Sequence, residues 1–478
     1  MRIFEIFIII TITAMAVNLI FLKRNKFNLI LSVLSVLFCI VSMMFEGYRV
    51  QMLPAYLLSF VLFLMNVIHS RKGMYHGKKS GRAAGAILLI LSLIVAAAFP
   101  VLFPVVKLPE PDGEYLVGTM NMSFTDKSRK EIFAASEQYR KIAVQIWYPA
   151  DDVKGKKTAA MFQNKRMSTY LAQSMQMPDL FGQIALVKTH SYLNAEISDK
   201  KSNYPILLFS GGYLGFAGQN TVLMEALASH GYIVFGISHP YEDFASVFPD
   251  GELLPYNNHQ VSSLQKELIN IGKAYAGDTS SAGFEKFQIE NAKISNKSIH
   301  IWSDDIKFIA DEIEKLANGE SKSILNNKLN ISNMGVFGHS FGGAASGQVC
   351  LEDKRFKGFI NMDGAPFGDS AKHVIKQPFM IIKGDVHKDL IEAGYFPQQT
   401  NYIDVTINGA KHIDFTDFTV LLPSFRYIGA LGSIGGDLQE DILKDCVISF
   451  FDKYLKGIKE PSINEKLSKY PEVTVEVK

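Results

Sequence analysis

The sequence is poor in the residues that build disulfide frameworks and metal centres. Only three of its 478 residues are cysteines. Cys39 falls in a long apolar run, and Cys350 and Cys446 fall in stretches typical of buried helices. The chain also has no HExxH motif, no paired CxxC motifs and no acidic calcium-binding loop. We therefore expect no disulfide bond, no metal and no other cofactor.

An excess of charge of either sign is missing as well. Lys and Arg total 49 and Asp and Glu total 47, which gives a formal net charge of +2. No basic stretch beyond the N-terminal region alternates with aromatic side chains, as a nucleic-acid groove requires. Nucleic acid is therefore not expected as a partner.

Long apolar runs, by contrast, are abundant. Hydrophobic residues make up 48% of the chain, and the mean hydropathy of +0.10 is high for a wholly soluble protein. Four runs lie at residues 3–22, 29–45, 52–68 and 84–106, each near the ~20 residues that span a bilayer as a helix. A cleaved signal peptide explains one run but not four in succession, which leaves buried soluble helices as the alternative. We predict a transmembrane region of four helices over residues 1–110, with the lipid bilayer as a partner.

The basic loops predict how this region is oriented. Basic residues follow the first and third runs, at Lys23, Arg24, Lys26, Arg71, Lys72, Lys78, Lys79 and Arg82. The loop between the second and third runs has only Arg49. Because basic loops stay cytoplasmic, the chain after Val106 is expected on the extracytoplasmic side of the cell membrane.

A second domain is predicted over residues 111–478. Pro100, Pro104, Pro109 and Pro111 break the chain at its start. Apolar strand-like runs follow at residues 142–147, 206–209, 233–237, 334–337, 359–362, 379–382 and 403–407. Helix-period segments lie between them, for example at residues 301–317 and 443–455. This alternation predicts an α/β fold with a mostly parallel sheet and helices on both faces.

Two segments do not fit this sheet. They cover residues 161–198, which are rich in Met and Phe, and residues 253–299, which are polar. Both are candidates for covers over an active site. The methionines could form an adaptable wall for an acyl chain, or they could simply pack into the core.

The most informative motif is MGVFGHSFGG at residues 334–343. An apolar strand, a sharp turn and small residues that open a helix are typical of a nucleophile elbow, with Ser340 at its tip. The neighbouring glycines let the strand and helix approach closely. A chain with 36 glycines can contain this pattern by chance in an ordinary loop, but the apolar run before it favours the elbow.

A serine nucleophile requires a base and an acid later in the chain. Only three histidines follow Ser340, namely His373, His387 and His412. His412 comes directly after the last predicted strand, where the base is expected. Asp363 and Asp385 each follow a strand, and motif position alone slightly favours Asp385 as the acid.

Acyl transfer also needs two backbone N–H donors for an oxyanion. The residue after the nucleophile, Phe341, supplies one. The second is expected near Tyr213, in the glycine-rich loop SGGYLGFAG that follows the strand at residues 206–209. A phosphate-binding loop is the alternative, but the loop lacks both the Lys-Ser/Thr pair of a P-loop and the Rossmann glycine spacing.

Five segments together resemble the platelet-activating factor acetylhydrolase family, the plasma-type lipases with the α/β-hydrolase fold. They read YPILLFSGGYLGF, LASHGYIV, GHSFGG, FKGFINMDGAP and GAKHIDFTDF. The resemblance implies Asp363 as the acid, because the family's acid lies in the stretch that matches INMDGAP. It also implies backbone donors at Tyr213 and Phe341. This chain departs from the family at Gly211, where relatives have histidine, and in its four apolar runs.

These observations predict a membrane-anchored serine esterase that needs no metal. Its expected substrates are short-chain carboxylic esters, including the sn-2 acetyl or short acyl group of a phospholipid. The alternatives are another activity of the same fold, such as a peptidase, an acyltransferase or a dienelactone hydrolase, and a non-catalytic membrane sensor that has kept the hydrolase shell.

Overall fold

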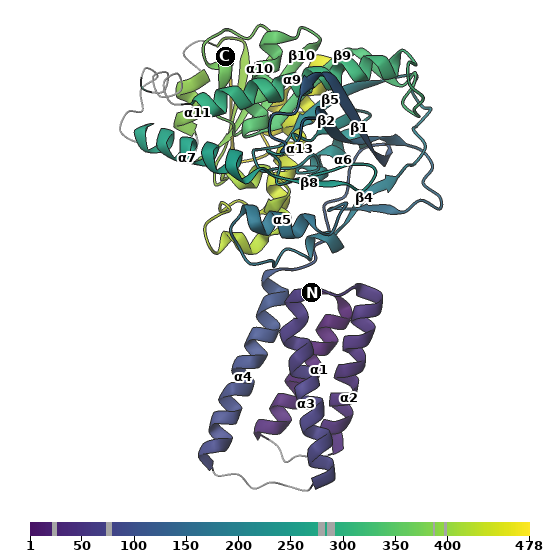
Figure 1. Ribbon diagram of the computed structural model, residues 1–478, viewed down its shortest axis with the longest axis vertical. Helices are drawn as coiled ribbons and strands as arrows, with labels where there is room; N and C mark the ends of the chain where they lie inside the picture. Colours follow the sequence, from purple (N-terminus) through teal and green to yellow (C-terminus); the bar gives the residue numbers. More distant parts are fainter. Residues whose placement is uncertain (22–25, 73–78, 276–282, 284–291, 386–387, 396–398) are drawn as a thin grey trace.

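A helical bundle stands against one side of a larger α/β domain (Figure 1). The computed structural model describes residues 1–21, 26–72, 79–275, 283, 292–385, 388–395 and 399–478. The N-terminus lies at the end of the bundle that meets the domain, and the C-terminus lies on the opposite side of the domain.

The bundle consists of α1 (Ile3–Phe21), α2 (Lys26–Val41), α3 (Leu53–Lys72) and α4 (Lys79–Leu102). A π-helical turn, Ser42–Glu46, continues α2. Four helices here are long and apolar enough to cross a membrane. The last of them ends at Leu102 rather than at Val106, because a residue that precedes a proline, as Phe103 does, is disfavoured in a helix.

Polar contacts join the helices at the end of the bundle nearest the domain. Arg49 and Glu5 are both buried, with Arg49 Nε 3.1 Å from Glu5 Oε1. Arg49 also donates from Nη2 to the carbonyl oxygen of Pro100 at 3.1 Å. These contacts connect the start of α1 and the turn before α3 to the last turn of α4.

The domain is built on one sheet of eleven strands in the order β13-β12-β11-β10-β9-β5-β6-β2-β1-β4-β3. Neighbours from β6 through β12 run parallel, as predicted. The strands are β1 (Leu116–Lys130), β2 (Tyr139–Ala150), β3 (Thr158–Ala160), β4 (Lys188–Leu193), β5 (Tyr204–Ser210), β6 (Ile233–Ile237), β9 (Leu329–His339), β10 (Phe356–Met362), β11 (Phe379–Gly384), β12 (Tyr402–Ile407) and β13 (Val473–Val477). A small separate sheet pairs β7 (Ala245–Val247) with β8 (Leu253–Pro255).

Helices cover both faces of the large sheet. The elements are α5 (Met167–Ser174), α6 (Thr221–Ser229), α7 (Asn258–Tyr275), α9 (Lys293–Ala317), α10 (Phe341–Glu352), α11 (Lys388–Tyr395), α12 (Phe418–Leu421), α13 (Gly436–Phe451) and α14 (Ile463–Leu467). Side chains of β5 alternate between the two faces. Ile206 and Leu208 pack with α9 and α10, while Leu207 and Phe209 pack with α6 and α13.

Of the two segments predicted to lie outside the sheet, the first joins it in part, whereas the described residues of the second contribute no strand to it. Residues 188–193, within the first of them, form β4 and pair with β1. Burial alternates along this strand, with Thr189 and Ser191 more buried than their neighbours. In the second segment α9 begins at Lys293, earlier than predicted. Residues 276–282 and 284–291 of that segment lie outside the described part of the chain.

The bundle and the domain meet at the first of these segments. Gln51 donates from Nε2 to the carbonyl oxygen of Leu180 and to Oε1 of Gln183, both at 2.6 Å. Phe103, just after α4, packs edge-on against Phe181 with ring centroids 6.3 Å apart. The contact therefore includes buried hydrogen bonds as well as apolar packing.

Candidate active site

A one-residue turn joins β9 to α10. The strand ends at His339, the helix begins at Phe341, and Ser340 between them has φ 55° and ψ −119°. A non-glycine residue rarely adopts such angles, so the turn is strained. A Cβ atom on Gly342 would lie 2.1 Å from the carbonyl oxygen of Ser210, which explains the glycine. This arrangement presents the Ser340 side chain at the carboxyl edge of the sheet.

The structure brings three predicted residues together. Nε2 of His412 lies 2.8 Å from Oγ of Ser340, and Nδ1 of His412 lies 2.6 Å from Oδ2 of Asp363. The His412 side chain is 32% exposed and that of Asp363 is 1% exposed. An imidazole whose Nδ1–H donates to a carboxylate has Nε2 available to accept the serine proton.

Of the two candidate acids, Asp363 is the one that contacts His412. It follows β10 with φ 56°, and its Oδ1 accepts a hydrogen bond from the Gly384 amide at 2.9 Å. Asp385 lies after β11, where its Oδ2 accepts from the Gly409 amide at 2.7 Å. His373 is exposed, with Nδ1 3.1 Å from the carbonyl oxygen of Asp369. His387 lies outside the described residues.

The glycine-rich loop after β5 passes directly beside the nucleophile. A Cβ atom on Gly212 would lie 3.4 Å from Cβ of Ser340, so the backbone that leads to Tyr213 runs past the serine. Phe341 is the first residue of α10, where backbone amides have no partner within the helix. Burial raises the pKa of the Tyr213 hydroxyl, which therefore stays neutral.

Two further residues, which the sequence analysis missed, connect this loop to the histidine. Oε1 of Gln219 accepts from the Gly212 amide at 3.0 Å, and its Nε2 lies 3.0 Å from Nδ1 of His339. Nε2 of His339 then lies 3.0 Å from the carbonyl oxygen of His412. In the sequence, the only sign of this link is that a histidine, His339, directly precedes Ser340. Gln219 also supports the loop at the point where this chain has Gly211 in place of the family's histidine.

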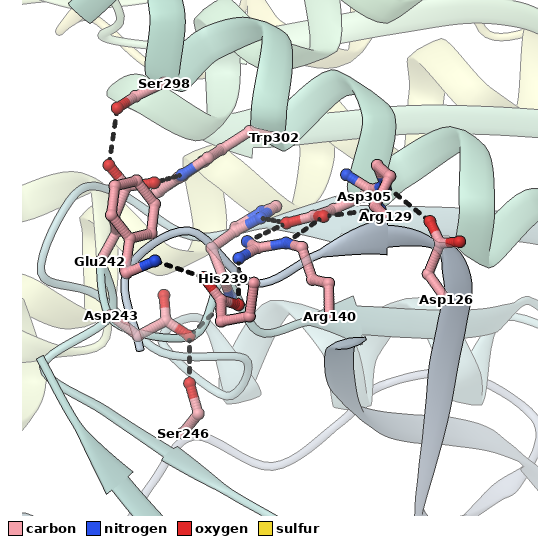
Figure 2. Close-up of polar contacts among 12 residues, drawn as sticks. Asp126, Arg129, Arg140, His239, Glu242, Asp243, Ser246, Ser298, Trp302 and Asp305 are labelled. Atoms are coloured by element: carbon pink, nitrogen blue, oxygen red, sulfur yellow. Dashed lines mark hydrogen bonds and ion pairs between the residues drawn. The ribbon is translucent and has the colours of Figure 1, made fainter. Parts of the chain in front are cut away.

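A buried charged network lies behind the loop (Figure 2). Oγ of Ser210, the residue that opens the loop, is 2.8 Å from Nε2 of His239, whose Nδ1 is 2.9 Å from Oδ2 of Asp305. Arg140 donates to both carboxylate oxygens of Asp305, at 2.7 Å and 2.6 Å. Burial lowers the pKa of His239, so the neutral ring donates to Asp305 and accepts from Ser210.

The same network supports the aromatic rings next to Ser340. The His239 ring stacks on Trp302 with centroids 3.8 Å apart and planes 7° apart. Trp302 packs edge-on against Phe341 at 5.0 Å and donates from Nε1 to Glu242 at 2.8 Å. His239, which no sequence motif singles out, is therefore linked to Phe341 through Trp302 and to the glycine-rich loop through Ser210.

The Met-rich segment, residues 161–198, packs into an apolar cluster that also includes the residue after His412. Met161, Phe162 and Met167 are buried in it, which favours the core interpretation over a free acyl-binding wall. The same cluster includes Phe418 and, partly buried, Ile413, the residue after His412.

One group of described residues has the ligand types for a metal ion. His300, Glu352 and Asp369 lie close enough to share one, on the outer side of α9 and α10. Oε2 of Glu352 is already paired with Nζ of Lys307 at 2.6 Å. The group contacts neither Ser340 nor His412, so it has no part in activating the serine.

Comparison with known proteins supports an ester hydrolase. A family model described as platelet-activating factor acetylhydrolase, isoform II, matches residues 101–468. The platelet-activating factor acetylhydrolase of Cavia porcellus is 24% identical over 73% of this chain and 78% of its own. A probable 1-alkyl-2-acetylglycerophosphocholine esterase of Arthroderma benhamiae is 23% identical over 81% of this chain and 97% of its own.

A solved structure shares the fold. The ferulic acid esterase of Streptomyces cinnamoneus superposes with a TM-score of 0.60 at 22% identity, covering 78% of this chain and 99% of that one. The sheet order and this likeness confirm the predicted α/β-hydrolase fold.

Proposed function

The chain belongs to the platelet-activating factor acetylhydrolase, isoform II, family and is a carboxylic ester hydrolase, and from this premise we propose that it is a membrane-anchored serine esterase with Ser340, His412 and Asp363 as its catalytic triad. The observation that carries the proposal is the pair of hydrogen bonds on His412, 2.8 Å to Ser340 and 2.6 Å to Asp363.

In this mechanism His412 takes the proton from Ser340 as Oγ attacks the ester carbonyl. The backbone amides of Tyr213 and Phe341 hold the negative oxygen of the tetrahedral intermediate. His412 then gives its proton to the departing alcohol, which leaves an acyl-enzyme. Water, deprotonated by the same histidine, releases the acid. Asp363 keeps the Nδ1 proton in place and stabilises the imidazolium that forms.

We propose that residues 1–110 anchor the enzyme and that residues 111–478 form the catalytic domain outside the cytoplasm. The four apolar helices support the anchor. The C-terminal ends of α1 and α3 and the N-terminal ends of α2 and α4 lie at the end of the bundle away from the domain (Figure 1). This fits basic loops on the opposite side of a membrane from the domain.

We propose short-chain esters as substrates, including acetylated or otherwise short-chain phospholipids. Support comes from the names of the relatives, which describe acetylglycerophosphocholine esterases. The rings of Tyr213 and Phe341, the two proposed donor residues, pack edge-on with centroids 5.6 Å apart, so the surroundings of these residues are apolar.

The test uses the full chain in mild detergent with p-nitrophenyl esters from acetate to palmitate and a fluorophosphonate label. We expect labelling at Ser340, preference for the short esters, and a loss of roughly 10⁴-fold or more in turnover for Ser340→Ala. Ser346→Ala is the matched control, because Ser346 lies in the same helix and donates to Gly342 O at 2.8 Å. Retained activity in Ser340→Ala would refute the proposal. Product analysis with peptide substrates tests for a peptidase, and product analysis with an added alcohol as acyl acceptor tests for an acyltransferase.

A further inference from the structure

The glycine-rich loop after β5 is built around the side chain of Gln219. This residue is 4% exposed, and a Cβ atom on Gly215 would lie 2.1 Å from its Oε1. A Cβ atom on Gly211 would lie 3.3 Å from the same oxygen. One on Gly212 would lie 2.9 Å from Nδ1 of His339. The glycines of the loop therefore leave the space that the side chains of Gln219 and His339 occupy.

The orientation of the Gln219 carboxamide follows from its partners. Its Oε1 must face the Gly212 amide, which can only donate, so its Nε2 faces Nδ1 of His339 and Oδ1 of Asn220. Nδ1 of His339 therefore accepts, and the ring proton lies on Nε2 of that histidine. This Nε2 donates to the carbonyl oxygen of His412 at 3.0 Å. We call the chain of hydrogen bonds from Gly212 through Gln219 and His339 to His412 the Gln219 bridge.

The bridge also determines where the proposed oxyanion donor points. The nitrogen of Gly212 is held by Gln219, and the carbonyl oxygen of Gly212 accepts from the Gly215 amide at 2.7 Å. Because a peptide group is planar and trans, the N–H of Tyr213 points away from that carbonyl. Both sides of Gly212 are thus fixed, and with them the direction of the Tyr213 amide.

We propose that Gln219 is a positioning residue that holds the Tyr213 amide and the base His412 in one fixed arrangement around Ser340. The inference rests on the proposed function, which gives these groups their roles. Without the carboxamide, the loop and the histidine segment lose the bridge between them and shift relative to each other. A displacement of about 1 Å at a reacting centre costs roughly 10²-fold in rate. The bridge therefore acts on the geometry of the reaction rather than on the binding of the ester.

The bridge is tested first without any turnover, by hydrogen exchange and mass spectrometry of the full chain in mild detergent. Gln219→Leu keeps the approximate size of the side chain and removes its polar atoms. We expect faster deuterium uptake in the peptide that contains residues 211–216 and also in the peptide that contains residues 410–416. Faster uptake in both peptides is expected because the bridge joins one to the other.

Gln348→Leu is the matched control for this experiment. Gln348 is also fully buried, accepts from the Asp369 amide at 2.7 Å and donates to Glu352 at 2.6 Å. It should leave the uptake of both peptides at the wild-type level. If Gln219→Leu leaves either peptide at that level, the proposal is wrong. Because hydrogen exchange needs no catalysis, this result stands even if Ser340 is not the nucleophile.

The consequence for the reaction is tested with p-nitrophenyl acetate. We expect Gln219→Leu to lower kcat about 10²-fold and to keep KM within about 2-fold of the wild type. Gln219→Asn is a milder second variant, because its amide is one carbon too short to reach both partners, and it should lose about 10-fold in kcat. Gln348→Leu should keep both constants. A raised KM with unchanged kcat would assign Gln219 to substrate binding and overturn the proposal.

A double-mutant cycle tests whether Gln219 and His339 act through the same bridge. Either Gln219→Leu or His339→Leu alone breaks it, so the double variant should lose little more kcat than the worse single variant. Additive losses would show that the two residues act separately and would contradict the proposal. No turnover in the wild type would instead refute the proposed function, and the exchange result would still decide whether the bridge exists.

Discussion

Asp305 offers the sharpest test of what stabilises the catalytic domain. Its side chain is fully buried and meets Arg140 through two hydrogen bonds, Arg129 at 3.0 Å and His239 at 2.9 Å. Burial would raise the pKa of Asp305, but Arg140 and then His239 outweigh burial and hold it below its usual range. The carboxylate is therefore ionised in the folded state, and Asp305→Asn removes its charge without changing its size.

The cost of that change follows from the burial of its partners. Removing one member of a buried ion pair costs about 3–5 kcal/mol when the remaining charge is left without compensation. Arg140 keeps its contact with Glu131 at 2.7 Å, so we expect a cost near the lower end of this range. For a domain the length of residues 111–478, the entropy of unfolding is roughly 0.8 kcal/mol per kelvin, so a cost within this range corresponds to a fall in Tm of about 4–6 °C. Asp305→Asn should also disturb His239 and, through it, Ser210 and Trp302, which support the active site. We therefore expect a lower kcat for p-nitrophenyl acetate.

A thiol-reactive fluorogenic dye can follow the unfolding of the full chain in detergent. All three cysteines are free and buried, and Cys350 and Cys446 lie in α10 and α13. A Cys39→Ser background limits the signal to the domain. Glu312→Gln is the control, since Glu312 pairs with the half-exposed Lys315 and such a pair contributes about 0.5 kcal/mol or less. A Tm for Asp305→Asn within 1 °C (roughly) of that control would refute the reasoning.

Two further predictions concern acidic residues. Asp363→Asn should lower kcat by roughly 10³–10⁴-fold in p-nitrophenyl acetate assays, whereas Asp385→Asn should change it only a few-fold, and the reverse order would move the acid to Asp385. Burial raises the pKa of Glu440 to about 8, so domain stability is greatest when it is protonated and falls as pH rises from its unfolded-state pKa through about 8. Glu440→Gln should therefore lose less Tm than the wild type between pH 6 and pH 9 (about) in the dye assay, and an equal loss would contradict this assignment.

The central sheet could be predicted because its strands are buried on both faces. All seven predicted runs lie within β2, β5, β6 and β9 to β12. β1 escaped notice because few of its residues are fully buried and its second half, SFTDKSRK, is polar. β4 was hidden in a segment that also contains a helix and several turns.

The positions of Ser340 and His412 were also accessible, because the carboxyl ends of parallel strands meet at one edge of the sheet. The acid was not accessible from motif position alone, since Asp363 and Asp385 both follow strands. The difference lies in backbone geometry, with Asp363 at φ 56° and Asp385 bonded to Gly409. The links from Gln219 to His339 and from His239 to Asp305 join residues far apart in sequence and become visible only after folding.

The last strand determines which strand forms one edge of the sheet. β13 pairs antiparallel with β12 from Ile403 opposite Val477 to Ile407 opposite Val473. It begins after residue 468, where the match to the family ends. A chain shortened to that boundary would leave the amides and carbonyls of β12 unpaired along an apolar edge, which a strand of another molecule can occupy. The final ten residues replace this edge with a short strand that carries Glu476 and ends beside Lys478, and a short, charged edge strand resists pairing with another molecule. A soluble version of the domain should therefore retain them.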